Sequence, residues 1–278
     1  MRATIAAWIS VLVIVRQGLC LDLAPETFIK YANGLAEREE YRAAAEEYYR
    51  TLSYFPSSRD DSDMVEGMLK LAEKSEDYHF TVRLAQQLEN SNYSNVDKCL
   101  ARYYRGRSLY WMGRHGGALM VLDLPNGCPP EVSAKGQYYV GLTYLRMRAW
   151  DDAGRVFEKL DAGFPFPDYK ARALETAHDG PKLRFRSPGI AGMVSFVLPG
   201  GGYFYAGSPK SGLAALLTVG MLSWGAISSF RSNNNGPGVV FSILGIGWHF
   251  GGVYGSAQAA RRYNEYLADK LIGGVEIP

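Results

Sequence analysis

The sequence predicts an all-α chain in two unlike parts, a series of stacked helical hairpins followed by a transmembrane helical hairpin. Apolar residues recur with helical periodicity over residues 26–170, and few segments there show the alternation of apolar and polar residues that is typical of strands. From Ser187 to Ala260 the only charged residues are Lys210 and Arg231, and this stretch holds 16 of the chain's 31 glycines. The change in composition separates a water-soluble half from an apolar half.

Residues 1–20 are expected to form a signal peptide. The apolar run Ala3–Val15 follows a basic start and is too short to span a membrane comfortably. Small residues at Gly18 and Cys20 offer a cleavage site. Two alternatives stay open: an uncleaved anchor, and a lipid-modified Cys20. The residue before that cysteine is Leu19, whereas the bacterial lipobox carries a small residue there.

If the signal peptide is cleaved, Cys99 and Cys128 remain, and an exported chain can join them in one disulfide. Two buried free thiols are the alternative. Neither cysteine stands at metal-ligand spacing or in a C-x-x-C motif. The four histidines, at positions 79, 115, 178 and 249, are scattered. We therefore expect no enzyme, no metal and no cofactor, and the net charge of +2 gives no reason to expect a nucleic acid.

Four helical hairpins are expected over residues 25–170. In the last of them, Gly141 and Ala153 allow two helices to cross closely, while Tyr144, Trp150 and Phe157 fill the space between them. The same order of residues marks three earlier units: Ala32, Leu35, Tyr41, Ala44, Tyr48 and Pro56; Leu69, Ala72, Tyr78, Thr81 and Ala85; Gly106, Leu109, Gly113, Ala118 and Leu122.

The equivalent positions 44, 81, 118 and 153 are about 35–37 residues apart. This pattern resembles the tetratricopeptide repeat, most weakly in the second unit, where Thr81 replaces the usual alanine. The resemblance implies a superhelix with a concave groove that binds a protein or peptide partner. The groove is expected to be lined by residues of the first helices: Asn33, Arg102, Arg105, Tyr139 and Thr143.

Residues 171–188 are expected to be a linker with a basic collar of Lys182, Arg184 and Arg186, suited to anionic headgroups. An ordinary polar linker is the alternative. The membrane domain is expected at 189–264, with spans at about 212–230 and 238–260 and a tail at 265–278.

The segment before the first span contains Pro199 and three consecutive glycines, which favour an interfacial or re-entrant element over a third span. In the last span, Gly247, Gly251 and Gly255 share one face. We expect this face to support close helix packing, either within the hairpin or between protomers.

The segments Pro199–Gly207 and Gly252–Asn264 resemble the "P-G-x-G-x-x-Y-x-G" membrane domain of uncharacterised bacterial tetratricopeptide proteins. Tyr203 stands where that family often has glutamine. The resemblances imply a scaffold of the bacterial envelope, anchored in the inner membrane with periplasmic repeats. Its partners would be a protein or peptide, the lipid bilayer and a second copy through the glycine face.

The alternative function is a subunit of an oligomeric channel or transport complex, with the repeats as its regulatory domain. The absence of acidic residues from the apolar stretch weighs against it. Topology presents a conflict for either function. With two spans and external repeats, Arg261 and Arg262 return to the outside, against the positive-inside tendency.

Overall fold

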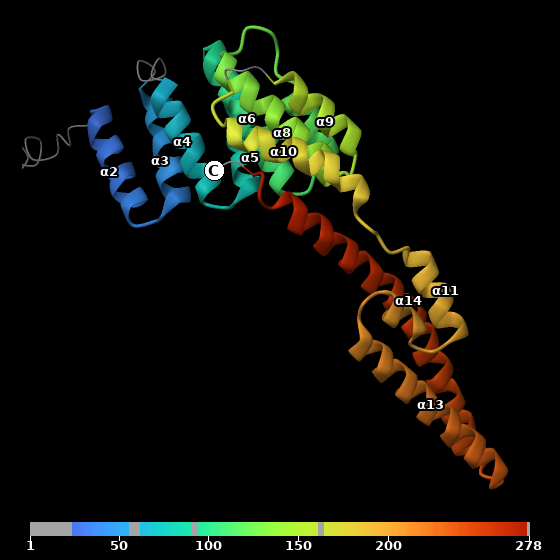
Figure 1. Cartoon of the computed structure of the whole chain (residues 1–278). Coiled ribbons are helices and arrows are strands. Elements are labelled where there is room, and N and C mark those ends of the chain that lie inside the picture. Colours follow the sequence, from blue (N-terminus) through green and yellow to red (C-terminus); the bar gives the residue numbers. More distant parts are fainter. Residues whose placement is uncertain (1–23, 56–61, 91–93, 161–163, 277–278) are drawn as a thin grey trace, which may run out of the picture. The chain divides into compact units, whose positions relative to one another are not determined.

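The computed structural model describes residues 24–55, 62–90, 94–160 and 164–276, which form helices and no strand (Figure 1). The expected all-α class is therefore confirmed for the described part of the chain. The chain divides into two compact units, Met1–Pro167 and Asp168–Pro278. The expected signal peptide lies outside the described residues.

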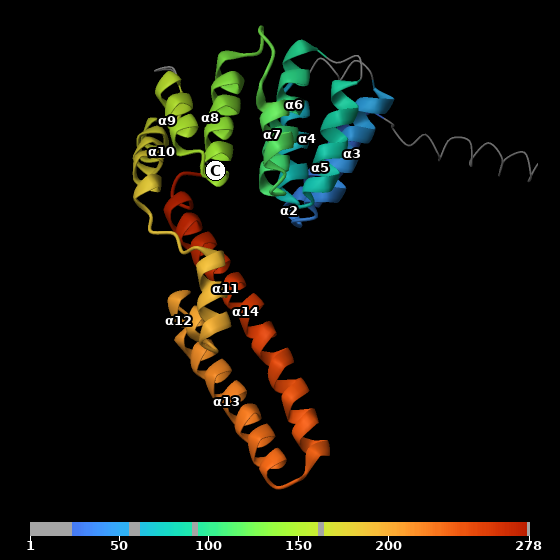
Figure 2. The ribbon, with the colours of Figure 1, turned by 90° about the vertical axis from the view of Figure 1, so that its right-hand side faces the viewer.

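Helices of the first unit follow one another as four hairpins (Figure 2). Each first helix also contacts its counterpart in the next hairpin from α4 onward, so the hairpins form one continuous stack. The pairs are α2 (Pro25–Glu37) with α3 (Tyr41–Tyr54), α4 (Ser62–Lys74) with α5 (Tyr78–Glu89), α6 (Asn95–Trp111) with α7 (His115–Leu122), and α8 (Pro130–Arg146) with α9 (Trp150–Lys159).

The four hairpins share the same turn. A residue with positive φ stands two residues before the start of each second helix, at Glu39, Glu76, Gly113 and Arg148, with φ between 58° and 71°. Backbone bonds such as Arg114 N–H to the Leu109 carbonyl, at 2.9 Å, close the first helix as left-handed caps do. Only one of the four is glycine, so the turn geometry repeats although its residue type does not.

Within the hairpins, a small residue on the first helix faces a large one on the second. A Cβ added to Gly106 would lie 2.5 Å from Leu122, and one added to Gly141 would lie 2.4 Å from Phe157. In the second hairpin the equivalent positions hold the large residue first and the small residue second, Leu69 and Ala85, both fully buried. The order of sizes in the second hairpin is therefore the reverse of that in the third and fourth hairpins.

The second unit contains one polar and four largely apolar helices: α10 (Pro167–Asp179), α11 (Pro188–Val197), α12 (Gly201–Tyr205), α13 (Pro209–Arg231) and α14 (Asn235–Ile272). The predicted linker at 171–188 is therefore wrong over most of its length, because α10 and a 3₁₀ turn (Gly180–Lys182) occupy it. The expected tail from 265 is also wrong up to Ile272, because α14 runs through that boundary without a break.

The segment with Pro199 and the glycines forms the turn between α11 and α12, and both helices contact α14. Gly200 has φ +81°, and a Cβ on it would lie 2.2 Å from the Gly212 carbonyl oxygen. Inside this turn the Ser195 hydroxyl accepts the Gly202 N–H at 3.0 Å, and the Ser256 hydroxyl donates to the Ala191 carbonyl at 3.1 Å. The polar backbone groups of the bend thus find partners within the unit.

Arg186, one member of the expected basic collar, is bound within the second unit. Its guanidinium donates to the Tyr205 carbonyl at 2.6 Å and lies 3.9 Å from the Tyr263 ring centroid. The Asn264 amide also pairs with both backbone groups of Arg186, each bond at 2.8 Å. Arg186 therefore joins the start of α11 to α14, while Lys182 and Arg184 stay exposed.

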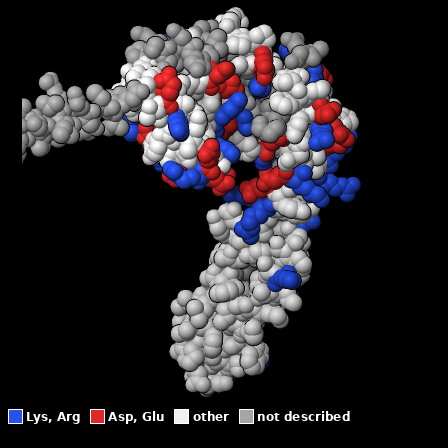
Figure 3. All heavy atoms as spheres, turned by 90° about the vertical axis from the view of Figure 1, so that its left-hand side faces the viewer, with Lys and Arg blue, Asp and Glu red and all other residues white. Residues whose placement is uncertain are grey.

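Among the described residues, two helices, α13 and α14, are long and apolar enough to span a membrane. Only 11% of the most apolar stretch of each helix is buried, whereas the core helix of a soluble protein is mostly buried. On the face shown in Figure 3, charged atoms gather over the first unit and few lie over this hairpin. The exposed apolar surface is typical of a membrane or partner contact.

Replacing Gly202 with alanine should destabilise the second unit by roughly 3 kcal/mol, because the new Cβ would lie 1.8 Å from the Ala191 carbonyl oxygen. Unfolding by dodecyl sulfate of the detergent-solubilised chain, followed by tryptophan fluorescence, measures the loss. Gly220→Ala is the matched control, since its Cβ meets nothing within 4 Å. Equal stability of the two variants would contradict the assigned contact.

Candidate functional site

Two of the residues expected to line a groove are instead buried in the first unit. Tyr139 and Thr143 on α8 are both 0% exposed. The Thr143 hydroxyl donates to the Tyr139 carbonyl at 2.6 Å, and the Tyr139 ring packs against Tyr103 and Tyr110. The expectation is wrong for these two residues, because they fill the space between neighbouring first helices and offer no accessible surface.

The other three expected groove residues make contacts inside the first unit. Arg105 and Arg102 on α6 lie 3.1 Å and 3.7 Å from Glu89 on α5, so they connect neighbouring hairpins. Burial raises the pKa of Glu89, and the two arginines partly oppose this rise. Asn33 accepts a hydrogen bond from the Tyr48 hydroxyl at 2.5 Å while remaining exposed. The structure does not bring the five residues together into one surface.

Sequence reasoning missed a largely buried ion pair between two first helices, whose arginine also contacts a third first helix. Glu73 on α4 lies 3.0 Å from Arg107 on α6, with side chains only 13% and 14% exposed. Arg107 also donates to the Tyr103 hydroxyl at 3.4 Å and lies 5.2 Å from the Tyr139 ring centroid on α8. Burial raises the Glu73 pKa to about 7, although Arg107 acts in the opposite direction. The signal that could have revealed this pair was a charged residue on the apolar face of each of the two helices, α4 and α6.

The raised Glu73 pKa predicts a pH-dependent stability. A carboxyl with a pKa of about 7 in the folded state and 4.5 as its ordinary value binds its proton more tightly when folded. Its contribution to stability therefore falls as pH rises from about 4.5 to 7, by up to about 3 kcal/mol. Glu73→Gln should lack this fall, as measured by thermal unfolding of the detergent-solubilised chain at pH 5 and pH 8.

Glu131→Gln provides a control of the opposite sign, since Lys135 lowers the pKa of Glu131. Because the lowered pKa keeps Glu131 ionised at both pH 5 and pH 8, the stability of that variant should differ from the parent equally at these two pH values, and the difference should vanish only at more acidic pH. If the difference between the parent and Glu73→Gln were the same at pH 5 and pH 8, the raised pKa of Glu73 would be incorrect.

The structure joins Cys99, at the start of α6, to Cys128 in the loop between α7 and α8. Cys99 is 1% exposed, so the bond fastens the loop at residues 123–129 to the body of the unit. Residues of this loop form part of the wall of the groove between α7, α8 and α9 that is described below. The disulfide therefore helps to define the shape of that cavity.

Replacing both cysteines with serine should destabilise the first unit by about 3 kcal/mol, because the bond closes a loop with a sequence separation of 29 residues. Amide exchange at residues 123–127 should accelerate, which mass spectrometry can follow. Reductant should produce the same change in the parent and none in the double variant. Unchanged exchange after the bond is removed would show that the loop does not need it.

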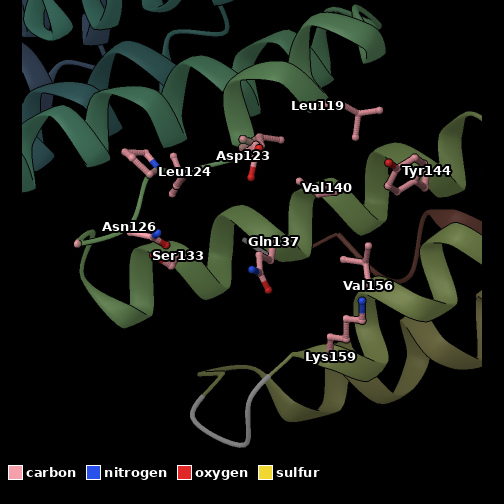
Figure 4. A pocket seen from close by; sticks show the side chains of 13 residues that line it. Leu119, Asp123, Leu124, Asn126, Ser133, Gln137, Val140, Tyr144, Val156 and Lys159 are labelled. Carbon is pink, nitrogen blue, oxygen red and sulfur yellow. The ribbon is translucent and has the colours of Figure 1, made fainter.

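A groove of about 510 Å³ opens between α7, α8 and α9 (Figure 4). Its half-buried apolar residues come from all three helices and the preceding loop, and polar side chains stand around them. The apolar group is Leu119, Leu124, Val140, Tyr144 and Val156, and the polar group includes Asp123, Asn126, Ser133, Gln137 and Lys159. An apolar floor with few polar groups around it is typical of a binding site.

The groove carries one charge of each sign. Asp123 and Lys159 are both exposed, and within the described part of the chain neither has an ion-pair partner. In Figure 4 they come from opposite sides of the groove, with α8 running between them. This arrangement suits a bound chain segment that carries apolar side chains and charged groups of both signs. Among the described residues, no group of three or more His, Cys, Asp or Glu could hold a metal.

The three glycines expected on one packing face separate into two kinds. A Cβ on Gly255 would lie 2.0 Å from the Tyr203 hydroxyl, so this glycine packs within the second unit. Gly247 and Gly251 have no such neighbour within 4 Å. Both border a second cavity, of about 660 Å³, between α13 and α14.

Comparisons with known proteins identified no relative of this chain. No family model matches the sequence, no curated protein matches it, and no solved structure matches the chain.

Proposed function

We propose that this protein is a membrane-anchored scaffold whose helical hairpins bind a segment of a partner protein in the groove between α7, α8 and α9. The observation that carries the proposal is the pairing of this apolar-floored groove, in one unit, with two exposed apolar helices in the other. Anchoring would confine the groove to the membrane surface and raise the local concentration of partners there.

We further propose that the hairpins form a tetratricopeptide-like superhelix. The support is the shared left-handed turn residue in all four hairpins, spaced about 35–37 residues apart, together with the buried positions Ala44, Thr81, Ala118 and Ala153. Repeats of this kind stack neighbour on neighbour and commonly bind peptides, so the partner-binding role follows from the proposed architecture.

The location we propose is the bacterial inner membrane, with the first unit in the periplasm. A disulfide persists in oxidising compartments and is rare in the cytosol, so the bond between Cys99 and Cys128 favours the external side. With α13 and α14 as the two spans, the helical turn formed by α11 and α12 would enter the bilayer without crossing it. The basic residues at 261 and 262 would then be outside, and the disulfide outweighs their contrary preference.

A photo-crosslinking residue at Val156 should capture one discrete partner in membranes, because this side chain lines the groove. The same residue at Met120 is the matched control, since Met120 is apolar and 81% exposed on α7 but does not line the groove. A lysine at Val140 should reduce the Val156 adduct at least fivefold. Equal adducts from positions 156 and 120, or none from either, would overturn the proposal.

A further inference from the structure

The cavity of the second unit lies between the first two turns of α13 and the middle of α14. Apolar side chains and glycines form most of its wall, including Ala214, Ile243, Leu244 and Trp248. Its polar lining residues are Ser211, in the first turn of α13, and Tyr203 on α12. The volume of about 660 Å³ is in the range of sites that hold small molecules.

The cavity lies beyond the part of α13 and α14 that is nearest to the turn joining them, where glycines allow close packing. A Cβ on Gly238 would lie 2.7 Å from Phe230, and one on Gly225 would lie 3.4 Å from Phe241. Farther from the turn, Gly247 and Gly251 meet nothing within 4 Å, which leaves their backbone exposed on the cavity wall. The unit therefore builds a hollow at a depth where hydrocarbon would surround it.

A positively charged residue, Lys210, is the sequence neighbour of one lining residue of this hollow. Lys210 directly precedes the lining residue Ser211, is exposed, and has no ion pair within the described residues. The stretch from Ser187 to Ala260 contains no Asp or Glu, so the same stretch of a second copy would offer this lysine no carboxylate. A lysine at the end of a span extends its amine toward the headgroup region.

We propose that the hollow binds one acyl chain of an anionic phospholipid, whose phosphate contacts Lys210 and the Ser211 hydroxyl. An acyl chain with a phosphate at one end matches an apolar cavity with a cation next in sequence to one of its lining residues. The inference rests on the membrane insertion put forward under the proposed function. It adds a lipid ligand to the anchor, and it gives the open glycines a role in making room for that ligand.

Quenching by brominated lipids tests the site, because Trp248 lines the hollow and Trp224 is exposed on α13 outside it. The full chain is placed in phosphatidylcholine vesicles that contain brominated phosphatidylglycerol or brominated phosphatidylcholine. In a Trp224→Phe variant at low salt, brominated phosphatidylglycerol should quench the fluorescence of Trp248 about fivefold more effectively than brominated phosphatidylcholine does. This is the preference for an anionic lipid that one cation near the surface provides. In a Trp248→Phe variant, Trp224 should show no preference.

Substitutions then separate the headgroup from the cavity. Lys210→Gln should abolish the preference seen by Trp248. Gly251→Leu should fill the hollow and abolish it too, while Gly220→Leu, at an equally open glycine outside the hollow, should preserve it. Equal quenching by both lipids, or loss of quenching on dimer formation, would overturn the proposal. Absence of quenching at Trp224 as well would instead disprove insertion, and with it the proposed anchor.

Discussion

At several positions in the described part of this chain, two segments pack so closely that one of them must carry glycine. In the first unit, Gly106 and Gly141 leave room for Leu122 and Phe157, and these contacts join the two helices of the third and fourth hairpins. In the second unit, Gly202 lies against the backbone of α11 and Gly200 lies against the backbone of α13. The stack of hairpins and the bend before α13 both depend on glycine at these close contacts. The stacked hairpins bury apolar surface away from water, whereas the second unit leaves apolar surface exposed.

The fold was largely predictable from the sequence because its main signals are local. Periodicity, small residues at hairpin crossings and the loss of charge after Ser187 each report a backbone or packing requirement of a single segment. The prediction was wrong at α10, where a polar sequence expected to be a linker forms a helix. It was also wrong at the end of α14, because the sequence contains no helix-ending signal at the predicted boundary and the helix continues past it. In both places the residues suit a linker or a tail as well as a helix.

The candidate site was much less predictable, because it depends on which face of each helix turns toward a neighbour. Tyr139 and Thr143 have the polarity of groove residues, yet neighbouring helices cover them completely. The groove itself combines Leu119, Val140 and Val156 from three helices, and no motif links these positions. Its loop is placed by a disulfide between cysteines whose pairing the sequence left open.

The length of α14 has a mechanical consequence. At 38 residues it measures about 57 Å, whereas the hydrocarbon core of a bilayer is about 30 Å thick. An uninterrupted helix resists bending and twisting, so its polar end is a rigid extension of its apolar part. A rotation or tilt of the apolar part would therefore be carried, through Asn264, as far as Ile272. A helix of this length can transmit torque along its axis, which a flexible segment of the same number of residues could not do.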